Sequence, residues 1–163
     1  MKILGIDPGT TRAGYGLIES KSGELILLKS GILKISSKDK NERLLELASE
    51  FEKLIKKEKP DLVALEKLFF VKNIKTGMDV SEARGILKFI ILKNKIAFME
   101  IAPTEVKLNI AGSGNADKKA VSKMVSRILG IDKIVGPDDI SDAAAIALVA
   151  SFRSKPIFQN FTK

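Results

Sequence analysis

The sequence of 163 residues contains no cysteine and no histidine, and these two absences exclude several kinds of chemistry. Without cysteine the chain forms no disulfide, no zinc–thiolate site and no thiol nucleophile. Without histidine it builds no Ser-His-Asp triad, no imidazole general base and no histidine metal site. Any catalysis must therefore depend on carboxylates, lysines, hydroxyl groups and hard cations.

The sequence also lacks a long hydrophobic run and a charged leader. No stretch approaches the roughly 18 apolar residues that a membrane-spanning helix needs. The first residues enter an apolar strand pattern directly, without the features of a signal peptide. We therefore expect a soluble, cytoplasmic protein that does not associate with a membrane.

Acidic residues are in deficit: 20 Asp and Glu stand against 28 Lys and Arg, which gives a formal net charge of +8. This excess of positive charge indicates a polyanionic partner such as nucleic acid. It points more weakly to an anionic membrane surface. A lysine-rich surface that serves only solubility is the alternative. The length suits one domain, and we predict a single domain over residues 1–153 with a basic tail at 154–163, a candidate for disorder.

Apolar periodicity predicts an α/β domain with five strands. The third strand is expected to continue to about residue 35, and the helix after it makes the first and fourth strands parallel if they pair. The predicted strands are residues 1–7, 13–19, 25–28, 62–65 and 97–101. The predicted helices are residues 41–58, 77–94, 103–110 and 117–129, with a last helix after Gly136-Pro137.

Two of the predicted strands end in an acid. The first strand ends at Asp7, where Pro8 and Gly9 stop it, and the fourth ends at Glu66. If these strands pair in parallel, the two carboxylates lie side by side at the edge where open α/β sheets place their chemistry. The alternative for Asp7 alone is that its side chain caps its own turn.

Two further acids, Asp139 and Asp142, lie three residues apart at the start of the last helix and so share a face. The alternative is a structural role, because Asp138 or Asp139 is a natural N-cap and acids favour the positive end of a helix dipole. One cap satisfies the helix, however, and three aspartates within five residues exceed that need. If this face meets the sheet edge with the first two acids, four carboxylates converge.

Four converging carboxylates require protons or a cation. Each like-charge pair near 4 Å costs about 4 kcal/mol at an effective dielectric constant of about 20. Oxygen ligands suit Mg²⁺ or Mn²⁺ rather than zinc, and two such ions bridging a phosphate would stabilise both oxygens of an in-line displacement. A basic protein with this site is best interpreted as a phosphodiester hydrolase whose nucleophile is water.

Several motifs follow one another along the chain. They are Gly5-Ile6-Asp7-Pro8-Gly9, Gly14-Tyr15-Gly16, Glu66 with Phe69 and Lys72-Asn73, Ala83-Arg84-Gly85, Gly112 to Lys118, and Asp139-x-x-Asp142-Ala143. From Ile3 to about Ala150 this ordered set resembles the RuvC family of Holliday-junction resolvases, within the ribonuclease H-like superfamily. The resemblance implies a ribonuclease H-like fold with a five-stranded mixed sheet flanked by helices.

The resemblance implies a homodimeric, Mg²⁺-dependent endonuclease of homologous recombination and DNA repair. It would nick two opposed strands of a four-way DNA junction symmetrically, leave 5′-phosphate and 3′-hydroxyl ends, and cooperate with a RuvA–RuvB branch-migration complex. The family's catalytic, metal-binding acids fall on Asp7, Glu66, Asp139 and Asp142. Asp138 is an extra neighbour, and the turn Thr11-Arg12-Ala13 departs from the family pattern, so no role carries over to Arg12.

Candidate DNA contacts lie near these acids. Phe69 is expected in a loop after Glu66, where it would stack on an unpaired base, an interaction worth about 1–3 kcal/mol; the alternative is that Phe69 or Phe70 fills the core. The resemblance also assigns phosphate contacts to basic residues, and at a helix start lysines oppose the dipole, which argues against a purely structural role there. These residues are Lys72, Lys107, Lys118 and Lys119.

The predicted helix at residues 77–94 is apolar over more than the roughly 100° stripe that a surface helix buries. Either it is enclosed within the domain or a second subunit shares it, and we favour a homodimer through this helix. Such a symmetric dimer matches the two-fold symmetry of a four-way junction.

Three other functions remain open. Asp7-Pro8-Gly9-Thr10-Thr11 also resembles the phosphate loop of actin-like sugar kinases and ATPases, but those proteins need two such domains. A non-catalytic junction-binding or scaffold protein of the same fold is the main alternative, against which the presence of all four acids argues. A related nuclease with another substrate, such as the RNA strand of a hybrid, shares the fold and differs only in its site.

Overall fold

The structure is a computed structural model that describes residues 1–9, 11–68 and 74–154. Its strands are β1 (Lys2–Pro8), β2 (Ala13–Lys21), β3 (Glu24–Leu33), β4 (Leu62–Glu66) and β5 (Ala97–Ile101). Its helices are α1 (Lys40–Glu58), α2 (Ile74–Lys93), α3 (Pro103–Ala111), α4 (Lys118–Ile128) and α5 (Asp138–Ser154). The predicted elements are all present with shifted ends, while the tail at 155–163 lies outside the described residues.

Local chemistry explains where the helices begin and end. The Asp39 carboxylate accepts hydrogen bonds from the backbone N–H groups of Asn41 and Glu42, which caps α1. At the other end Lys59 adopts a left-handed conformation, and its N–H donates to the Ile55 carbonyl. Asp117 caps α4 in the same way by accepting from the Ala120 N–H. These caps satisfy backbone groups that a helix end leaves without partners.

The five strands form one mixed sheet in the order β3-β2-β1-β4-β5. The hairpins β1–β2 and β2–β3 are antiparallel, whereas β1 pairs with β4, and β4 with β5, in parallel. The predicted parallel pairing of the first and fourth strands is therefore confirmed. As a result the carboxyl ends of β1, β4 and β5 lie along the same sheet edge.

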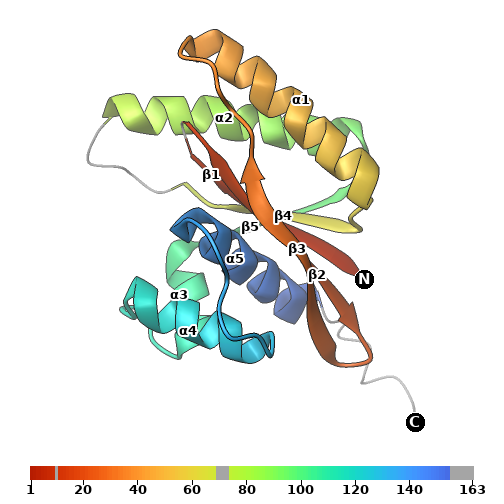
Figure 1. The fold of residues 1–163 in the computed structure, drawn as a ribbon, viewed down its shortest axis with the longest axis vertical. Helices are drawn as coiled ribbons and strands as arrows, with labels where there is room; N and C mark the ends of the chain where they lie inside the picture. The colour runs from red at the N-terminus through yellow and green to blue at the C-terminus, as the bar shows by residue number, and fades with distance from the viewer. Residues whose placement is uncertain (10, 69–73, 155–163) are drawn as a thin grey trace.

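Helices cover both faces of the sheet, with α1 and α2 on one face and α3, α4 and α5 on the other (Figure 1). The alternation of side chains along β1 follows these two layers. Leu4 and Ile6 pack into the core beneath α1 and α2, whereas Ile3 packs into the core beneath α5. Asp7 lies an even number of residues after Ile3, so its side chain lies on the same face of the sheet as Ile3, the face covered by α5.

Helix α5 lies unusually close to the sheet. A Cβ atom added to Gly16 would lie 2.8 Å from the Ala144 Cα, and one added to Gly5 would lie 2.6 Å from the Ala147 N. Glycines on the strands and alanines on the helix thus replace the side chains that normally keep the two layers apart. The small, apolar composition of this helix predicts such tight packing, and the structure confirms it.

Helix α2 is only partly covered by the rest of the chain. Its buried side chains are those of Ala83, Leu87, Ile90 and Ile91. By contrast Met78, Phe89 and Leu92 are 61%, 64% and 57% exposed. Within the described residues, no helix has the length and apolar character needed to cross a membrane.

Candidate active site

The site begins with the two acids at the carboxyl ends of β1 and β4. The parallel register pairs Gly5 with Ala64 and Ile6 with Leu65. The next positions are Asp7 and Glu66, so the two acids occupy neighbouring strand ends on the α5 face of the sheet. The side-by-side placement predicted from strand order is therefore present.

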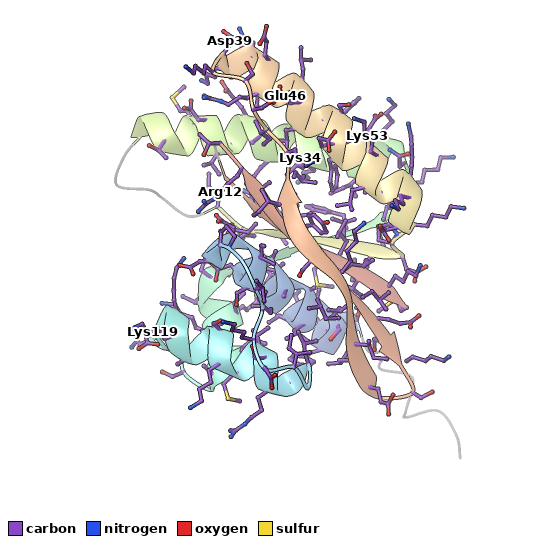
Figure 2. All side chains as sticks on the ribbon, in the orientation of Figure 1. Arg12, Lys34, Asp39, Glu46, Lys53 and Lys119 are labelled. Atoms are coloured by element: carbon purple, nitrogen blue, oxygen red, sulfur yellow. The ribbon has the colours of Figure 1, made fainter. Side chains whose placement is uncertain are left out.

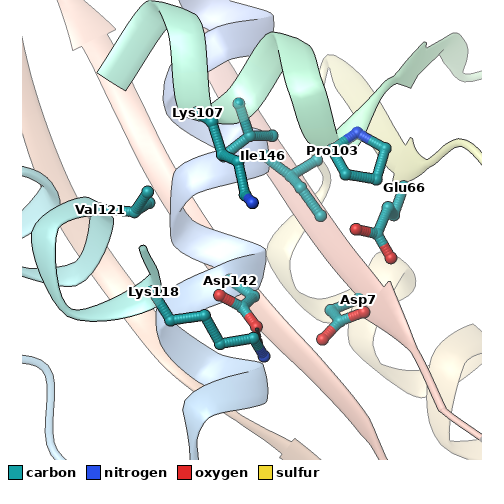
Figure 3. A pocket seen from close by; sticks show the side chains of 9 residues that line it. Asp7, Glu66, Pro103, Lys107, Lys118, Val121, Asp142 and Ile146 are labelled. Atoms are coloured by element: carbon teal, nitrogen blue, oxygen red, sulfur yellow. Dashed lines mark hydrogen bonds and ion pairs between the residues drawn. The ribbon is translucent and has the colours of Figure 1, made fainter. Parts of the chain in front are cut away.

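The first turn of α5 brings the other two acids to this edge. A Cβ atom on Gly14 of β2 would collide with the Asp139 carbonyl oxygen, so the helix start rests directly on the strand backbone. Asp142 lies nearly one turn further along the helix, and its carboxylate lies beside the Lys118 ammonium (Figure 3). The close packing of the glycine-bearing strands against α5 is therefore what carries these acids to the strand ends.

Three of the four acids line one cleft of about 240 Å³. Its charged residues are Asp7, Glu66, Asp142, Lys107 and Lys118, and Pro103, Val106, Val121 and Ile146 supply an apolar wall. The Lys118 ammonium lies 3.0 Å from Asp142 Oδ2. In Figure 3 the carboxylates of Asp7 and Glu66 face the same opening from the sheet side. The cleft therefore combines acids from three elements with bases from two helices.

Asp139 lies beside this cleft and is not part of its lining. Its Oδ2 atom is 2.7 Å from Nε of Arg12, in an ion pair whose side chains are 21% and 53% exposed. The geometry is that of a close charge contact only, since the buried Oδ2 has no hydrogen-bond partner among the described residues. The predicted meeting of four carboxylates is thus partial: three share the cleft, and the fourth is paired with an arginine at its rim.

Burial and mutual repulsion perturb the acids of the cleft. The pKa of Asp7 rises from 3.8 to about 7, first because burial disfavours the charged form and then because Glu66, Asp142 and Asp139 are negative. The pKa of Glu66 is also raised, by burial and then by Asp142. The hydrogen bond to Asp142 raises the pKa of Lys118, which remains a cation. The cleft therefore favours additional positive charge.

The donor set fits a hard divalent cation. The cleft offers carboxylate oxygens and no nitrogen or sulfur ligands other than protonated lysines, which suits Mg²⁺ or Mn²⁺. The Asp139 Oδ2, buried without a hydrogen bond, is a further oxygen with unused acceptor capacity. Yet within the ranges described, no three acids already stand close enough to hold one ion together. In this arrangement a cation would be held by one or two of the carboxylates, with water completing its shell, as is usual for Mg²⁺.

The remaining predicted residues occupy different places. Lys107, on α3, and Lys118 line the cleft. Lys119 is exposed on α4 and lines a neighbouring groove, as does Asp138 (Figure 2). Phe69 and Lys72 lie outside the described residues.

Two arginines near the acids, Arg12 and Arg84, were assigned no role from the sequence. Arg12 pairs with Asp139 as described, although the unusual turn around it was visible in the sequence. Arg84 of α2 lies 2.5 Å from Glu100 of β5 and, through its charge, lowers the pKa of Glu66. Arg84 therefore links α2 to β5 through an ion pair, and its positive charge offsets part of the negative charge around Glu66.

Comparison with known proteins identifies the family. The family model described as "Crossover junction endodeoxyribonuclease RuvC" matches residues 3–150. The chain belongs to the RuvC family. The RuvC of Caldicellulosiruptor saccharolyticus is 44% identical over 150 residues, which cover 91% of this chain and 90% of that protein. The RuvC of Prochlorococcus marinus is 42% identical over 154 residues, covering 94% and 99% of the two chains.

A solved RuvC structure has the same fold. T. thermophilus RuvC in complex with a Holliday junction substrate is 30% identical, with a TM-score of 0.87 over 94% of each chain. The predicted ribonuclease H-like fold, a five-stranded mixed sheet flanked by helices, is thereby confirmed, as is the resemblance to RuvC.

Proposed function

We propose that this protein is a structure-selective endonuclease that resolves four-way DNA junctions in recombination and repair. It nicks two opposed strands symmetrically. The observation that carries the proposal is the cleft in which Asp7, Glu66 and Asp142, from β1, β4 and α5, face Lys107 and Lys118. Family membership and the T. thermophilus RuvC complex with a Holliday junction support the choice of substrate.

The metal site is assigned to Asp7, Glu66, Asp139 and Asp142, with Mg²⁺ as the ion, Mn²⁺ as a substitute, and two ions per site. Support comes from the oxygen donors and from the raised pKa of Asp7. Such ions, when bound, polarise the scissile phosphate and lower the pKa of water. The work of the acids is to fix the ions at the sheet edge, where β1 and β4 hold two of them rigidly.

Water is the nucleophile, because no hydroxyl side chain lines the described cleft. Water adds to phosphorus and the bond to the 3′ oxygen breaks, which leaves a 5′-phosphate and a 3′-hydroxyl. Lys107 and Lys118 neutralise the phosphate oxygens from α3 and α4. The apolar wall formed by Val106, Val121 and Ile146 limits the water that can compete for those oxygens.

Further DNA contacts are assigned outside the cleft. Lys119 at the exposed start of α4 and Lys72 hold backbone phosphates, and Phe69 stacks on an unpaired base. Each phosphate neutralised by a lysine adds about 0.9 to the salt dependence of binding. Stacking by Phe69 would stabilise an open base pair at the centre of the junction, which is where the nuclease acts.

The protein acts as a homodimer through α2. Met78, Phe89 and Leu92 are exposed on this helix at spacings that place them on one stripe. Gly85 lies on the same stripe, and no atom of the described residues lies within 4 Å of its Cβ position. A second copy of α2 would bury this stripe and place two clefts about a two-fold axis, as two symmetric nicks require.

The cellular setting follows from the family. We propose a single nuclease domain over residues 1–153, a cytoplasmic location, and cooperation with a RuvA–RuvB branch-migration complex. Co-purification of the protein with RuvA–RuvB on a four-way junction tests the last point. If this protein and RuvA–RuvB do not bind the same junction together at saturating concentrations, the proposed cooperation is wrong.

The function is tested on a labelled four-way junction and a linear duplex, with Mg²⁺ or with EDTA. We expect paired nicks in the junction only, and only with Mg²⁺. Asp7→Asn should bind the junction without cutting it, while Glu24→Gln, at an exposed acid of the β2–β3 hairpin, should cut normally. Tight binding without cleavage under Mg²⁺ and Mn²⁺ would contradict the proposal and favour the scaffold function.

A further inference from the structure

Arg12 stands where a bound cation would need Asp139. It lies one residue before β2, beside the first turn of α5 (Figure 2), and its Nε is 2.7 Å from Asp139 Oδ2. Asp139 and Asp142 are separated by three residues on α5 and so share one face. Asp142 lines the cleft, whereas Asp139, paired with Arg12, does not.

The ion pair with Arg12 does not remove the effect of Asp139 on the cleft. Asp139 contributes to the raised pKa of Asp7, so the two carboxylates are within electrostatic range. Asp139 shares a face of α5 with Asp142, so a carboxylate released from Arg12 would be available to the cleft. In the metal-free protein the ion pair with Arg12 holds this acid at the rim.

Lys118 repeats this arrangement on Asp142 of α5. Its ammonium lies 3.0 Å from Asp142 Oδ2. Asp139 and Asp142 thus each have a cation from outside α5, whereas the described residues form no ion pair with Asp7 or Glu66. Arg12 and Lys118 therefore neutralise acids of α5, and the two acids at the strand ends have no such counter-ion among the described residues.

The Arg12 contact can be displaced at little cost. The arginine side chain is 53% exposed, and its partner oxygen accepts no hydrogen bond in the described structure. Because Asp139 Oδ2 is itself buried, the guanidinium leaves at little cost only when another cation takes its place. A divalent cation carries twice the charge of a guanidinium and accepts several carboxylates at once, so it would outcompete Arg12 for Asp139.

We propose that Arg12 is a displaceable counter-ion that couples metal binding to DNA binding. In the metal-free protein it pairs with Asp139 and competes with the divalent cation. When the cation takes Asp139, the guanidinium is released at the rim of the cleft and binds a backbone phosphate of the junction. This inference rests on the proposed nuclease function and adds a DNA-binding residue to it.

The released side chain suits its second partner. A guanidinium presents several donors in a plane and binds phosphate oxygens with two parallel hydrogen bonds. Linkage then requires reciprocity: if metal strengthens junction binding through Arg12, the junction strengthens metal binding by the same factor. Arg12→Gln should weaken this coupling, and Arg12→Lys, which keeps the charge, should restore most of it.

The first measurement is Mn²⁺ binding by calorimetry without DNA. Removing the competitor should tighten Mn²⁺ binding by Arg12→Gln about two- to fivefold, the scale of an exposed ion pair. Arg127→Gln, at an exposed arginine in the last turn of α4, should bind Mn²⁺ like the wild type. Unchanged or weaker Mn²⁺ binding by Arg12→Gln would overturn the proposal.

The second measurement is the salt dependence of junction binding, in EDTA and in Ca²⁺, with gels to verify that the DNA stays intact. Arg12→Gln should lose about 0.9 from the slope in Ca²⁺ and nothing in EDTA. Arg127→Gln should change the slope equally in both conditions. An equal loss in both conditions for Arg12→Gln would show that Arg12 contacts DNA without being displaced, which overturns the proposal.

The two measurements separate this inference from the proposed function. If wild type nicks junctions while Arg12→Gln binds Mn²⁺ and DNA as wild type does, only the Arg12 inference is wrong. If wild type neither binds Mn²⁺ nor nicks junctions, the nuclease proposal itself is wrong. Thermal unfolding of Arg12→Gln should match wild type, because a half-exposed side chain contributes little to folding.

Discussion

Replacing Asp7 by asparagine should stabilise the metal-free protein, and increasingly so as the pH rises. Asp7 is a mostly buried acid whose pKa is raised from 3.8 to about 7 by burial and by its acidic neighbours. The unfolded chain ionises this group near pH 4, whereas the folded chain keeps its proton until about pH 7. The folded state therefore binds more protons between these values, and stability falls as the pH increases.

The size of the effect follows from the shift. One pKa unit corresponds to about 1.4 kcal/mol, so a rise from 3.8 to about 7 costs on the order of 4 kcal/mol once the group is ionised in both states. This figure is an upper limit because the cleft is open to water. The cost is absent below about pH 4, develops between pH 4 and pH 7, and is constant above. Asparagine has no charge and avoids it.

The assay is urea unfolding in EDTA at several values between pH 5 and pH 8. The free energy of unfolding of Asp7→Asn should exceed that of wild type by an amount that grows with pH, and Mg²⁺ should narrow the gap at pH 8 by stabilising wild type. Asp132→Asn, at an exposed acid, should show no such growth. A gap that stays constant from pH 5 to pH 8 would refute the reasoning that the acids of the cleft are buried together.

Three other perturbations test separate parts of the structure. Gly14→Ala should destabilise the protein by about 1–3 kcal/mol in urea unfolding because the new methyl group pushes α5 off the sheet, whereas Gly114→Ala, with open space around it, should have little effect; equal stabilities would contradict the packing argument. Phe89→Glu should yield monomers in analytical ultracentrifugation while Leu45→Glu, at an exposed residue of α1, leaves the dimer intact, and a dimeric Phe89→Glu would exclude the α2 interface. Lys107→Gln should lower the salt slope of junction binding by about 0.9, and an unchanged slope would remove Lys107 from the DNA surface.

The sequence allowed the sheet edge to be predicted because its causes are local. Apolar runs that end in Asp7 and Glu66 defined two strands, and the helix before the fourth strand made the two parallel on the condition that they pair. The small residues of α5 likewise predicted its close approach to the sheet. These features depend on side-chain volume and alternation, which can be judged from the order of residues alone.

Ion pairing at the rim was not predictable in this way. Arg12 and Asp139 lie on elements whose relative orientation is set by glycine contacts between β2 and α5, and Lys118 reaches Asp142 only because α4 packs beside α5. Long basic side chains have many possible partners, and tertiary packing decides among them. For the same reason the sequence predicts four acids as one set, while the structure places Asp139 at the rim.

The most direct test of the account is the single-turnover rate of junction cleavage, with Mg²⁺ at saturation, for Asp7→Asn, Glu66→Gln, Asp139→Asn and Asp142→Asn, each measured beside junction affinity. The account predicts that every variant loses roughly 10²-fold or more in rate, the scale of removing a group that stabilises charge in a transition state, and still binds the junction. Asp139→Asn is the most informative of the four variants, because the Asp139 side chain lies outside the cleft. Wild-type cleavage by Asp139→Asn would contradict the claim that the four acids act as one metal-binding set.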